Sequence, residues 1–308
     1  MSGGHRARAG RPSSSNAHRP DHQEARAMPT FDTPDPIQAT IEVLVGQVRI
    51  TADERDRTVV QVRPTDADAE ADVRAAEQTR IEYADGRLLI RTPRQKKLGL
   101  FGRTGSVDVT VELPAGSRVQ GSASVGGFKG TGRLGECRWK SGTGDFHAED
   151  TGRLDLNTAA GSVEVTHVDG RADVSTATGR IRIAEITGPA EISNSNGDSW
   201  IGSVTGDIRV KAANGDIAVD RARAGVNTTT ANGSIRVDGV VAGPVSAKTS
   251  LGEIEVGIDG DTAAWLDLHT QFGTVHHLLE QSAAPEEHER SVEVRARSSF
   301  GDIRIRRS

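Results

Sequence analysis

The stretch that decides the fold is NGDSWIGSVTGDIRVKAANGDIAV, residues 196–219. The pattern Gly-Asp-Ile-x-Val begins at Gly206 and again nine residues later at Gly215, and small or polar residues follow each copy. Successive side chains of a β-strand point to opposite faces, so Ile217 and Val219 are expected to point inward and the residues beside them outward. Each unit of about nine residues therefore predicts one short strand and one turn.

Glycine repeats this unit along the chain in two interleaved series whose steps are close to 18 residues. The first series is Gly144, Gly161, Gly179, Gly197, Gly215, Gly233 and Gly252, and the second is Gly152, Gly170, Gly188, Gly206, Gly225 and Gly243. A fixed period of this kind is typical of solenoids. Each strand would stack in parallel on its counterpart one coil later, about 4.8 Å away. The sequence predicts an all-β, parallel β-solenoid of ~18-residue, two-strand coils.

The predicted turns carry repeated polar side chains. Asn196, Asn214 and Asn232 precede unit glycines at steps of 18, which favours a ladder of hydrogen-bonded amides. A second row lies three positions before the glycines and consists of Thr158, Thr176, Thr230, Thr249 and Thr270. Both rows are interpreted as structural.

The composition fits a thin aliphatic core, because aromatic residues make up only 3% of the chain and glycine occurs 35 times. Stacked sheets about 10 Å apart leave little room for facing rings. The few large aromatics are therefore expected at ends, plugs or contact points, namely Trp139, Trp200, Trp265, Phe272 and Phe300. The last coils are expected to use their large residues as a plug. Arg304, Arg306 and Arg307 would charge the last strand against edge-to-edge growth.

Three regions follow from the local composition. Residues 1–28 are rich in Arg, Ser, Gly, Pro and His and predict a disordered tail, and Met28 is an alternative start of the native protein. Residues 29–118 predict an N-terminal β-rich capping segment with a short helix at 66–78 and a hairpin at Asp85-Gly86. Residues 119–308 predict the solenoid with C-terminal capping coils.

Several classes are disfavoured by simple counts. No apolar run approaches the ~18 residues of a membrane span, and neither a signal peptide nor an anchor is visible. The single Cys137 argues against a disulfide framework, and the net charge of −5 argues against a nucleic-acid partner. These features predict a soluble, cytoplasmic protein without a transmembrane segment.

Four segments carry a resemblance to a known family: SNSNGDSWIG (193–202), AANGDIAVD (212–220), RLGECRWKSGTGD (133–145) and SSFGDIRIRRS (298–308). Together they resemble the bacterial "putative adhesin" family of β-strand repeats, a domain of unknown function, over roughly residues 29–308. The resemblance implies a solenoid fold and no known active site. It carries over no functional residues, because the matching motifs are structural.

Candidate sites are few. An outward row of one sheet holds Asp155, Asp173 and Glu191 at steps of 18, and stacked carboxylates suggest a cation site or the paired acids of a glycosidase. Flanking arginines favour a solvated, ion-paired face instead. Trp200 is expected on an outer face between Arg182 and Ala218, either as a docking point for a sugar or protein or beneath a turn or the N-terminal segment.

The loop Gln95–Gly105 combines Lys96 and Lys97 with Phe101, which suggests contact with an anionic membrane or a partner, or simply a hairpin tip. No metal site is expected, because the G-G-x-G-x-D turns of calcium-binding rolls are absent and His276 and His277 would point to opposite faces. No cofactor motif is present, and Cys137 is expected in the core.

The leading functional hypothesis is a non-catalytic scaffold that presents a rigid surface to an unknown protein partner or to itself. The alternative is a carbohydrate-binding or carbohydrate-processing β-helix that uses Trp200 or the row Asp155–Glu191. A surface adhesin is a third possibility.

Overall fold

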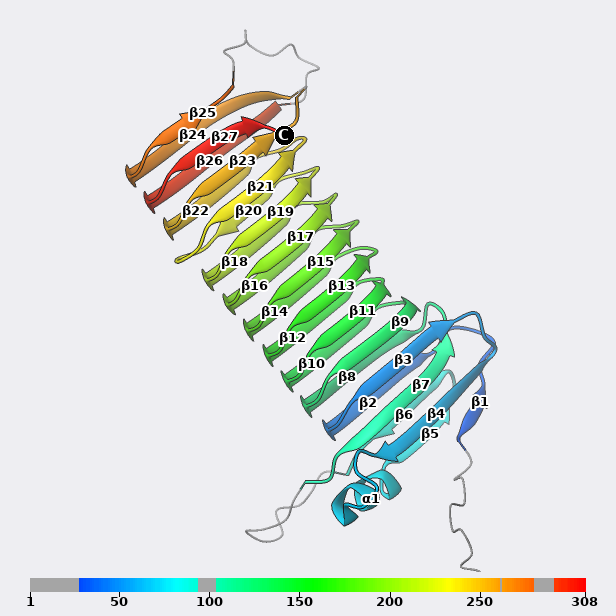
Figure 1. The fold of residues 1–308 in the computed structure, drawn as a ribbon. Helices are drawn as coiled ribbons and strands as arrows, with labels where there is room; N and C mark the ends of the chain where they lie inside the picture. The colour runs from blue at the N-terminus through cyan, green and yellow to red at the C-terminus, as the bar shows by residue number, and fades with distance from the viewer. Residues whose placement is uncertain (1–27, 94–103, 261, 280–290) are drawn as a thin grey trace, which may run out of the picture.

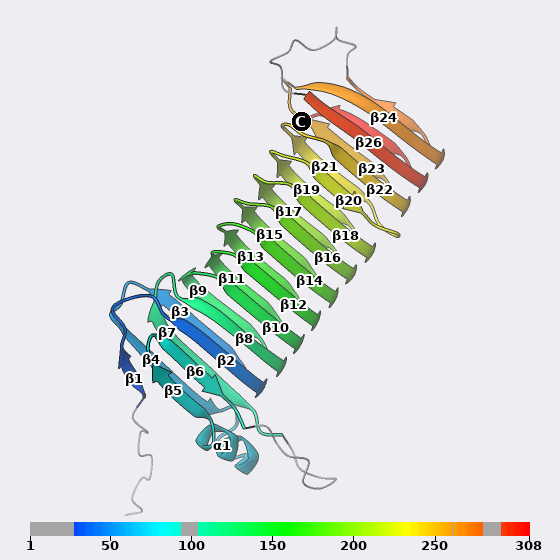
Figure 2. The ribbon, with the colours of Figure 1, turned by 180° about the vertical axis from the view of Figure 1, so that it is seen from behind.

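The computed structural model describes residues 28–93, 104–260, 262–279 and 291–308. Over these residues the chain forms two long β-sheets, one with fourteen strands and one with thirteen, which we name sheet A and sheet B. The sheets lie face to face along one axis, as the opposite views in Figures 1 and 2 show. The single helix among the described elements is α1 (Glu70–Glu77), which lies within the range 66–78 expected from the sequence.

The order of strands across each sheet follows the axis of the solenoid. Sheet A runs through β1 (Thr30–Asp32), β4 (Arg57–Pro64), β7 (Val107–Pro114), β3 (Val48–Asp53), β9 (Phe128–Leu134), β11 (Phe146–Thr151), β13 (Val163–Val168), β15 (Ile181–Ile186), β17 (Ser199–Val204), β19 (Ile217–Ala222), β21 (Ile235–Val240), β23 (Ile254–Ile258), β27 (Ile303–Arg307) and β25 (Val275–His277). Sheet B runs through β24 (Ala263–Phe272), β26 (Ser291–Phe300), β22 (Val245–Leu251), β20 (Val226–Thr229), β18 (Ile208–Asn214), β16 (Ala190–Asn196), β14 (Ala172–Thr178), β12 (Leu154–Ala160), β10 (Cys137–Thr143), β8 (Arg118–Val125), β2 (Gln38–Val45), β6 (Arg87–Arg91) and β5 (Arg80–Ala84).

The repeat sets the register of these sheets. Ile183, Ile201 and Val219 lie opposite one another on parallel strands, one coil apart. All three side chains are at most 1% exposed, and their equivalents in the other coils fill the space between the sheets. The parallel β-solenoid expected from the 18-residue period is confirmed.

The polar rows at the turns form as expected. The side-chain amide of Asn214 donates to Asn196 Oδ1 at 2.9 Å, and that of Asn232 donates to Asn214 Oδ1 at 2.8 Å. The threonine row points inward, and its hydroxyls donate to turn carbonyls, as Thr249 does to Gly233 O at 2.9 Å. Asn194 occupies the same row and bonds two such carbonyls. These contacts hold each turn to its neighbours.

The expectation that rings stay outside the core is wrong for one part of the solenoid. Trp139, Phe128 and Phe146 are buried together, with ring centroids 4.7–4.8 Å apart. Room for the indole comes from Gly121, which lies opposite Trp139 on β8, where a Cβ would be 2.3 Å from Trp139 Cζ3. Because Gly121 points inward and has no side chain, the indole of Trp139 fits between the two sheets.

At the N-terminal end the chain order and the spatial order differ. Strands β2 and β3 lie between the coil of β6 and β7 and the coil of β8 and β9. The hairpin expected at Asp85-Gly86 joins β5 and β6, and α1 packs against β4 and β7. The expected boundary between residues 118 and 119 falls within β8, after its first residue, and both sheets continue across this region.

The C-terminal end shows the same kind of exchange. Strands β26 and β27 lie between the coil of β22 and β23 and the outermost coil of β24 and β25. The expected charged last strand is therefore not an edge, and Arg306 is paired with Glu255 and Asp238, each at 2.6 Å. Trp265, Phe272 and Phe300 are each at least half exposed, so these large residues do not plug the end in the part of the chain that the structure describes.

Candidate functional site

The row of acids expected from the sequence lies on the outer face of sheet B. Asp155, Asp173 and Glu191 are register neighbours on β12, β14 and β16. Arg171 donates to Asp173 at 2.8 Å and lies 3.8 Å from Glu191. Arg138 approaches Asp155 at 3.2 Å in the same manner. The row is thus interleaved with guanidinium groups, as the solvated, ion-paired interpretation expects.

The electrostatics of Asp173 do not suit acid catalysis. Hydrogen bonds from Arg171 are the largest influence and hold the pKa of the Asp173 carboxyl below its ordinary value, against a smaller opposing effect of burial. The charges of Arg171 and Arg153 act in the same direction as the hydrogen bonds. A general acid of a glycosidase needs a raised pKa instead. Asp173 is therefore an ion-pair partner that stays ionised.

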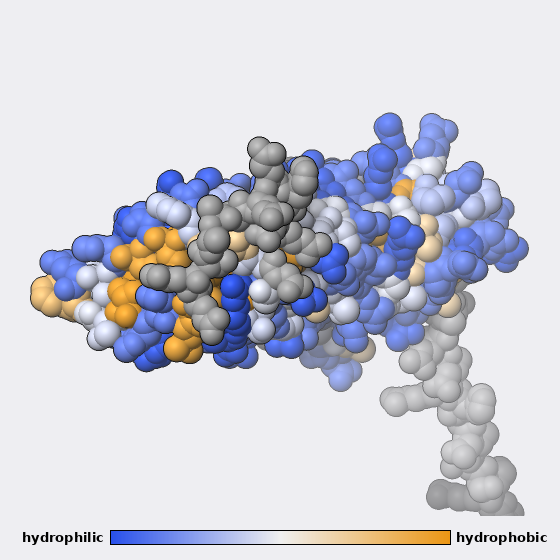
Figure 3. Space-filling view, turned by 90° about the horizontal axis from the view of Figure 1, so that it is seen from above, coloured by the Kyte–Doolittle hydropathy of each residue, from blue (hydrophilic) through white to orange (hydrophobic). Residues whose placement is uncertain are grey.

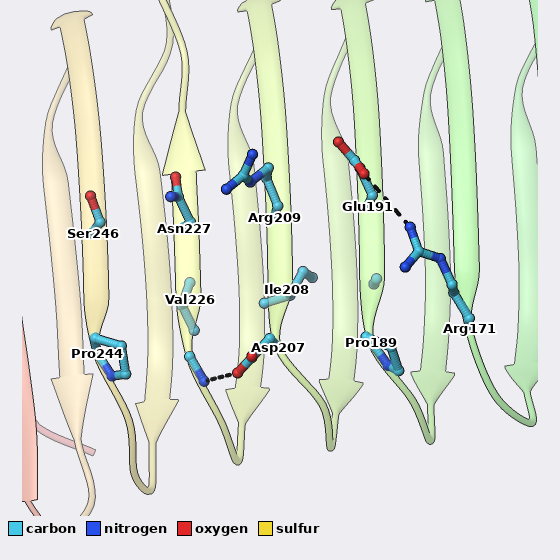
Figure 4. A pocket seen from close by; sticks show the side chains of 12 residues that line it. Arg171, Pro189, Glu191, Asp207, Ile208, Arg209, Val226, Asn227, Pro244 and Ser246 are labelled. Carbon is cyan, nitrogen blue, oxygen red and sulfur yellow. Dashed lines mark hydrogen bonds and ion pairs between the residues drawn. The ribbon is translucent and has the colours of Figure 1, made fainter.

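Beyond Glu191 the row continues as Arg209, Asn227 and Ser246 on β18, β20 and β22, and here the surface is hollowed. The groove has a volume of about 430 Å³ and lies beside the turns that begin these strands. Its lining consists of Arg171, Pro189, Ala190, Glu191, Asp207, Ile208, Arg209, Gly225, Val226, Asn227, Pro244 and Ser246. Figure 4 shows the prolines along one side of it and the polar row along the other.

Arg209 differs from Arg138 and Arg171, the arginines that are ion-paired along this row. Glu191 is its register neighbour but contacts Arg171, so no carboxylate lies within 4.0 Å of the Arg209 guanidinium among the residues that the structure describes. Asp207 is occupied as well, because its Oδ1 accepts the backbone N–H of Gly225 at 2.9 Å. The groove therefore presents five guanidinium N–H donors next to the Asn227 amide and the Ser246 hydroxyl.

Trp200 lies on the opposite face, on β17 of sheet A, between Arg182 and Ala218 as expected. The Arg182 guanidinium stacks on the indole at 3.9 Å from the ring centroid, and the indole N–H donates to Asp220 at 3.1 Å. The half-buried ring is thus held by its own neighbouring strands. The structure does not bring Trp200 together with the acidic row.

The remaining expected contact residues, Lys96, Lys97 and Phe101, lie outside the described residues. Arginines beside the acidic row were expected from the sequence, but the groove was missed. A usable signal was Pro189 and Pro244, which stand at equivalent turns three coils apart and border it.

No group of three or more His, Cys, Asp or Glu side chains in the described part of the chain is arranged to hold a metal ion. His147 and His167 each approach one carboxylate at 3.2 Å, Glu164 and Asp150 respectively. None of the helices in the described ranges is long and apolar enough to cross a membrane. Cys137 is buried, as expected.

Comparison with known proteins places this fold in a family of unknown function. No curated protein matches the chain. Among solved structures, the "putative adhesin" of Parabacteroides distasonis is 19% identical with a TM-score of 0.38, and the match covers 90% of this chain and 95% of that one. The "putative adhesin" of Parabacteroides merdae is 15% identical with a TM-score of 0.36, covering 91% and 95%. That of Bacteroides fragilis is 12% identical with a TM-score of 0.35, covering 91% and 97%.

The family model described as Toastrack DUF4097 matches residues 40–306, which include the groove and nearly all of both sheets. This match confirms the resemblance to an adhesin-like family of unknown function, and the chain belongs to the Toastrack DUF4097 family.

Proposed function

We propose that the protein is a non-catalytic, adhesin-like scaffold that binds a protein partner in the groove on sheet B. The observation that carries this proposal is Arg209, whose guanidinium has no carboxylate partner in the described chain although the neighbouring row is ion-paired. An exposed guanidinium next to an apolar rim is a common centre of binding energy in protein interfaces.

The chemistry of the groove favours an acidic, extended segment of the partner. Arg209 offers a planar set of N–H donors that fits a carboxylate. Asn227 and Ser246, the next residues of the row, add an amide and a hydroxyl that can bind the rest of the segment. Pro189 and Pro244 add rigid apolar surface at the edge. Because the strands beneath belong to a continuous sheet, binding costs little ordering of the scaffold itself.

The absence of catalysis is part of the proposal. Acid–base catalysis on this face would need a carboxyl with a raised pKa, whereas that of Asp173 is lowered. The buried thiol of Cys137 is also unsuited to attack, because burial raises its pKa to about 12.

The test is capture of partners from lysate of the native host on immobilised protein, followed by mass spectrometry and measurement of the affinity. Arg209→Ala should weaken binding of the captured protein at least about tenfold. Arg153→Ala is the matched control, because Arg153 lies on the same face but pairs with Asp173 at 3.5 Å. Equal capture by the wild type and by Arg209→Ala would contradict the proposal.

Carbohydrate binding is the second candidate, and one observation favours it. Trp200 and Arg182 form an outward aromatic and cationic pair on sheet A, the kind of surface on which sugar rings stack. A glycan array tests this directly: bound glycans should be lost with Trp200→Ala and kept with Asp173→Asn. An array without signal removes the candidate.

The cellular location is a further part of the proposal. We propose the cytoplasm, on the sequence features given above. Fractionation of the native host with detection of the protein distinguishes a cytoplasmic scaffold from a surface adhesin.

A further inference from the structure

The two ends of the solenoid are built differently. At the N-terminal end, sheet A finishes with β4 and β1 and sheet B with β5, all of which pair antiparallel to their neighbours. Helix α1 packs beside them. At the C-terminal end, both sheets finish with parallel strands, β24 and β25, which have no further strand beyond them in the described chain.

Exposed apolar side chains are concentrated in the last three coils. Of the eight large apolar residues that are exposed in the described chain, six belong to the last coils: Leu251, Trp265, Phe272, Val275, Leu278 and Phe300. Leu278 is 78% exposed, the highest value among them. Figure 3 looks onto this end and shows apolar atoms gathered there between hydrophilic ones.

Strand β24 also lacks the features by which natural proteins protect an edge. Its ten residues, AAWLDLHTQF, contain no proline, no lysine and no arginine. Its one acid, Asp267, is neutralised by Arg297 at 2.6 Å. Protected edges usually carry unpaired charges, prolines or bulges that prevent pairing with another strand. The edge is therefore suited to pairing.

The symmetry of a two-fold contact makes a second copy of this chain the fitting occupant. A two-fold axis at Leu268 would run the two β24 strands antiparallel, with Leu268 opposite Leu268 and Asp267 opposite His269 of the second copy. Inward residues would stay inward, because positions 266, 268 and 270 share one face of the strand. The pairing thus matches inward side chains with inward ones and places the polar Asp267 and His269 side by side.

The size of the surface agrees with this occupant. A ten-residue strand is ~34 Å long, and two stacked sheets with their side chains are ~20 Å wide, so each copy would bury about 700 Å². The total of about 1,400 Å² lies in the range of stable, specific interfaces, roughly 1,200–2,000 Å². Because a two-fold contact uses the same end of both copies, assembly would stop at two copies.

We propose that the protein forms a two-fold dimer through its C-terminal coil, with β24 of each copy extending sheet B of the other. The dimer uses the end of the solenoid and is independent of the groove. A failed dimer experiment therefore leaves the proposed partner site untouched, and a failed capture experiment leaves the dimer untouched.

The first measurement is the mass of the full-length protein in solution by light scattering and sedimentation, over low to high micromolar concentration. The wild type should be a dimer. Leu278→Lys and the double variant Val275→Lys with Leu278→Lys should raise the dimer dissociation constant, the double variant at least about a hundredfold. Val125→Lys is the matched control, because Val125 is exposed to 49% but lies on β8, far from this end.

The second measurement fixes the orientation. Cys137 is buried, so a spin label attaches selectively to an introduced cysteine. Labels at Gln271→Cys should lie about 20 Å apart, because three residues separate each from the axis at ~3.4 Å per residue. Labels at Glu77→Cys in α1 should show no measurable distance. A monomeric wild type, a dimer that survives the double variant, or close labels at position 77 would each overturn the proposal.

Discussion

Gly215 lies so close to the carbonyl oxygen of Gly197 that a Cβ on Gly215 would be 2.2 Å from that oxygen. The φ angle of Gly215 is +133°, in the region that residues with side chains rarely adopt. The same approach recurs one coil later, where a Cβ on Gly233 would be 2.1 Å from Gly215 O. The turns therefore require glycine at these positions, and this requirement explains why glycine recurs about every 18 residues in the sequence.

The variant Gly215→Ala should lower the free energy of unfolding by about 3 kcal/mol or more, because it combines backbone strain with a clash against main chain. Urea unfolding followed by circular dichroism measures the change. Gly86→Ala is the matched control, since Gly86 has a φ of +71° but no heavy atom within 4 Å of the added Cβ. It should lose only about 1 kcal/mol. Equal losses would show that the clash has no effect.

Asn194 provides a second test, in the buried polar row. Its amide donates to Gly179 O at 2.9 Å and to Gly197 O at 2.8 Å. Asn194→Ala should cost about 3 kcal/mol, because two part-buried carbonyls lose their donor. Asn194→Thr should cost less than half as much, since Thr176 occupies the equivalent position and donates to Thr178 O. A threonine variant as unstable as the alanine variant would contradict this reading of the row.

The repeat could be predicted from the sequence because every coil obeys the same local rule. Ile217 and Val219 point inward, as alternation requires, and Asn214 bonds Asn196 as the 18-residue spacing indicates. The ion-paired nature of the row at Asp173 followed equally from its flanking arginines.

The ends could not be predicted, because their strands are ordered by long-range pairing. Nothing in the local pattern of β2 places it between β6 and β8, and the same holds for β26 between β22 and β24. The groove was missed for a related reason. Glu191 contacts Arg171 and not Arg209, and the sequence pattern does not show which of the two arginines it contacts, because both lie at a similar sequence distance from it.

The burial of Trp139 depends on Gly121, and this dependence can be measured. Gly121→Ala should cost about 3 kcal/mol, because its Cβ would lie 2.3 Å from Trp139 Cζ3 and 2.6 Å from Ile41 O. In a Trp139→Leu background the same change should cost at least about 1 kcal/mol less, a coupling visible in a double-mutant cycle. The clash with the Ile41 carbonyl prevents full recovery. Additive effects of the two substitutions would rule out the proposed compensation.

Cys137 should give the protein a specific sensitivity to alkaline pH. Burial is the main cause that raises the pKa of its thiol from 9.0 to about 12, so the folded state keeps the proton after the unfolded state has lost it. The contribution to stability is unchanged below pH 9 and is lost as pH rises from 9 toward 12, by up to ~1.4 kcal/mol per pH unit.

Urea unfolding at several pH values, compared between the wild type and Cys137→Ala, isolates this contribution. The alanine variant should show a shallower loss of stability above pH 9. In the native wild type the thiol should also resist alkylation by iodoacetamide at neutral pH and react only once urea unfolds the chain, because the nucleophile is the thiolate and Cys137 is 0% exposed. Rapid alkylation of the folded protein, or identical pH profiles of the two proteins, would contradict a buried, protonated thiol in the core of the solenoid.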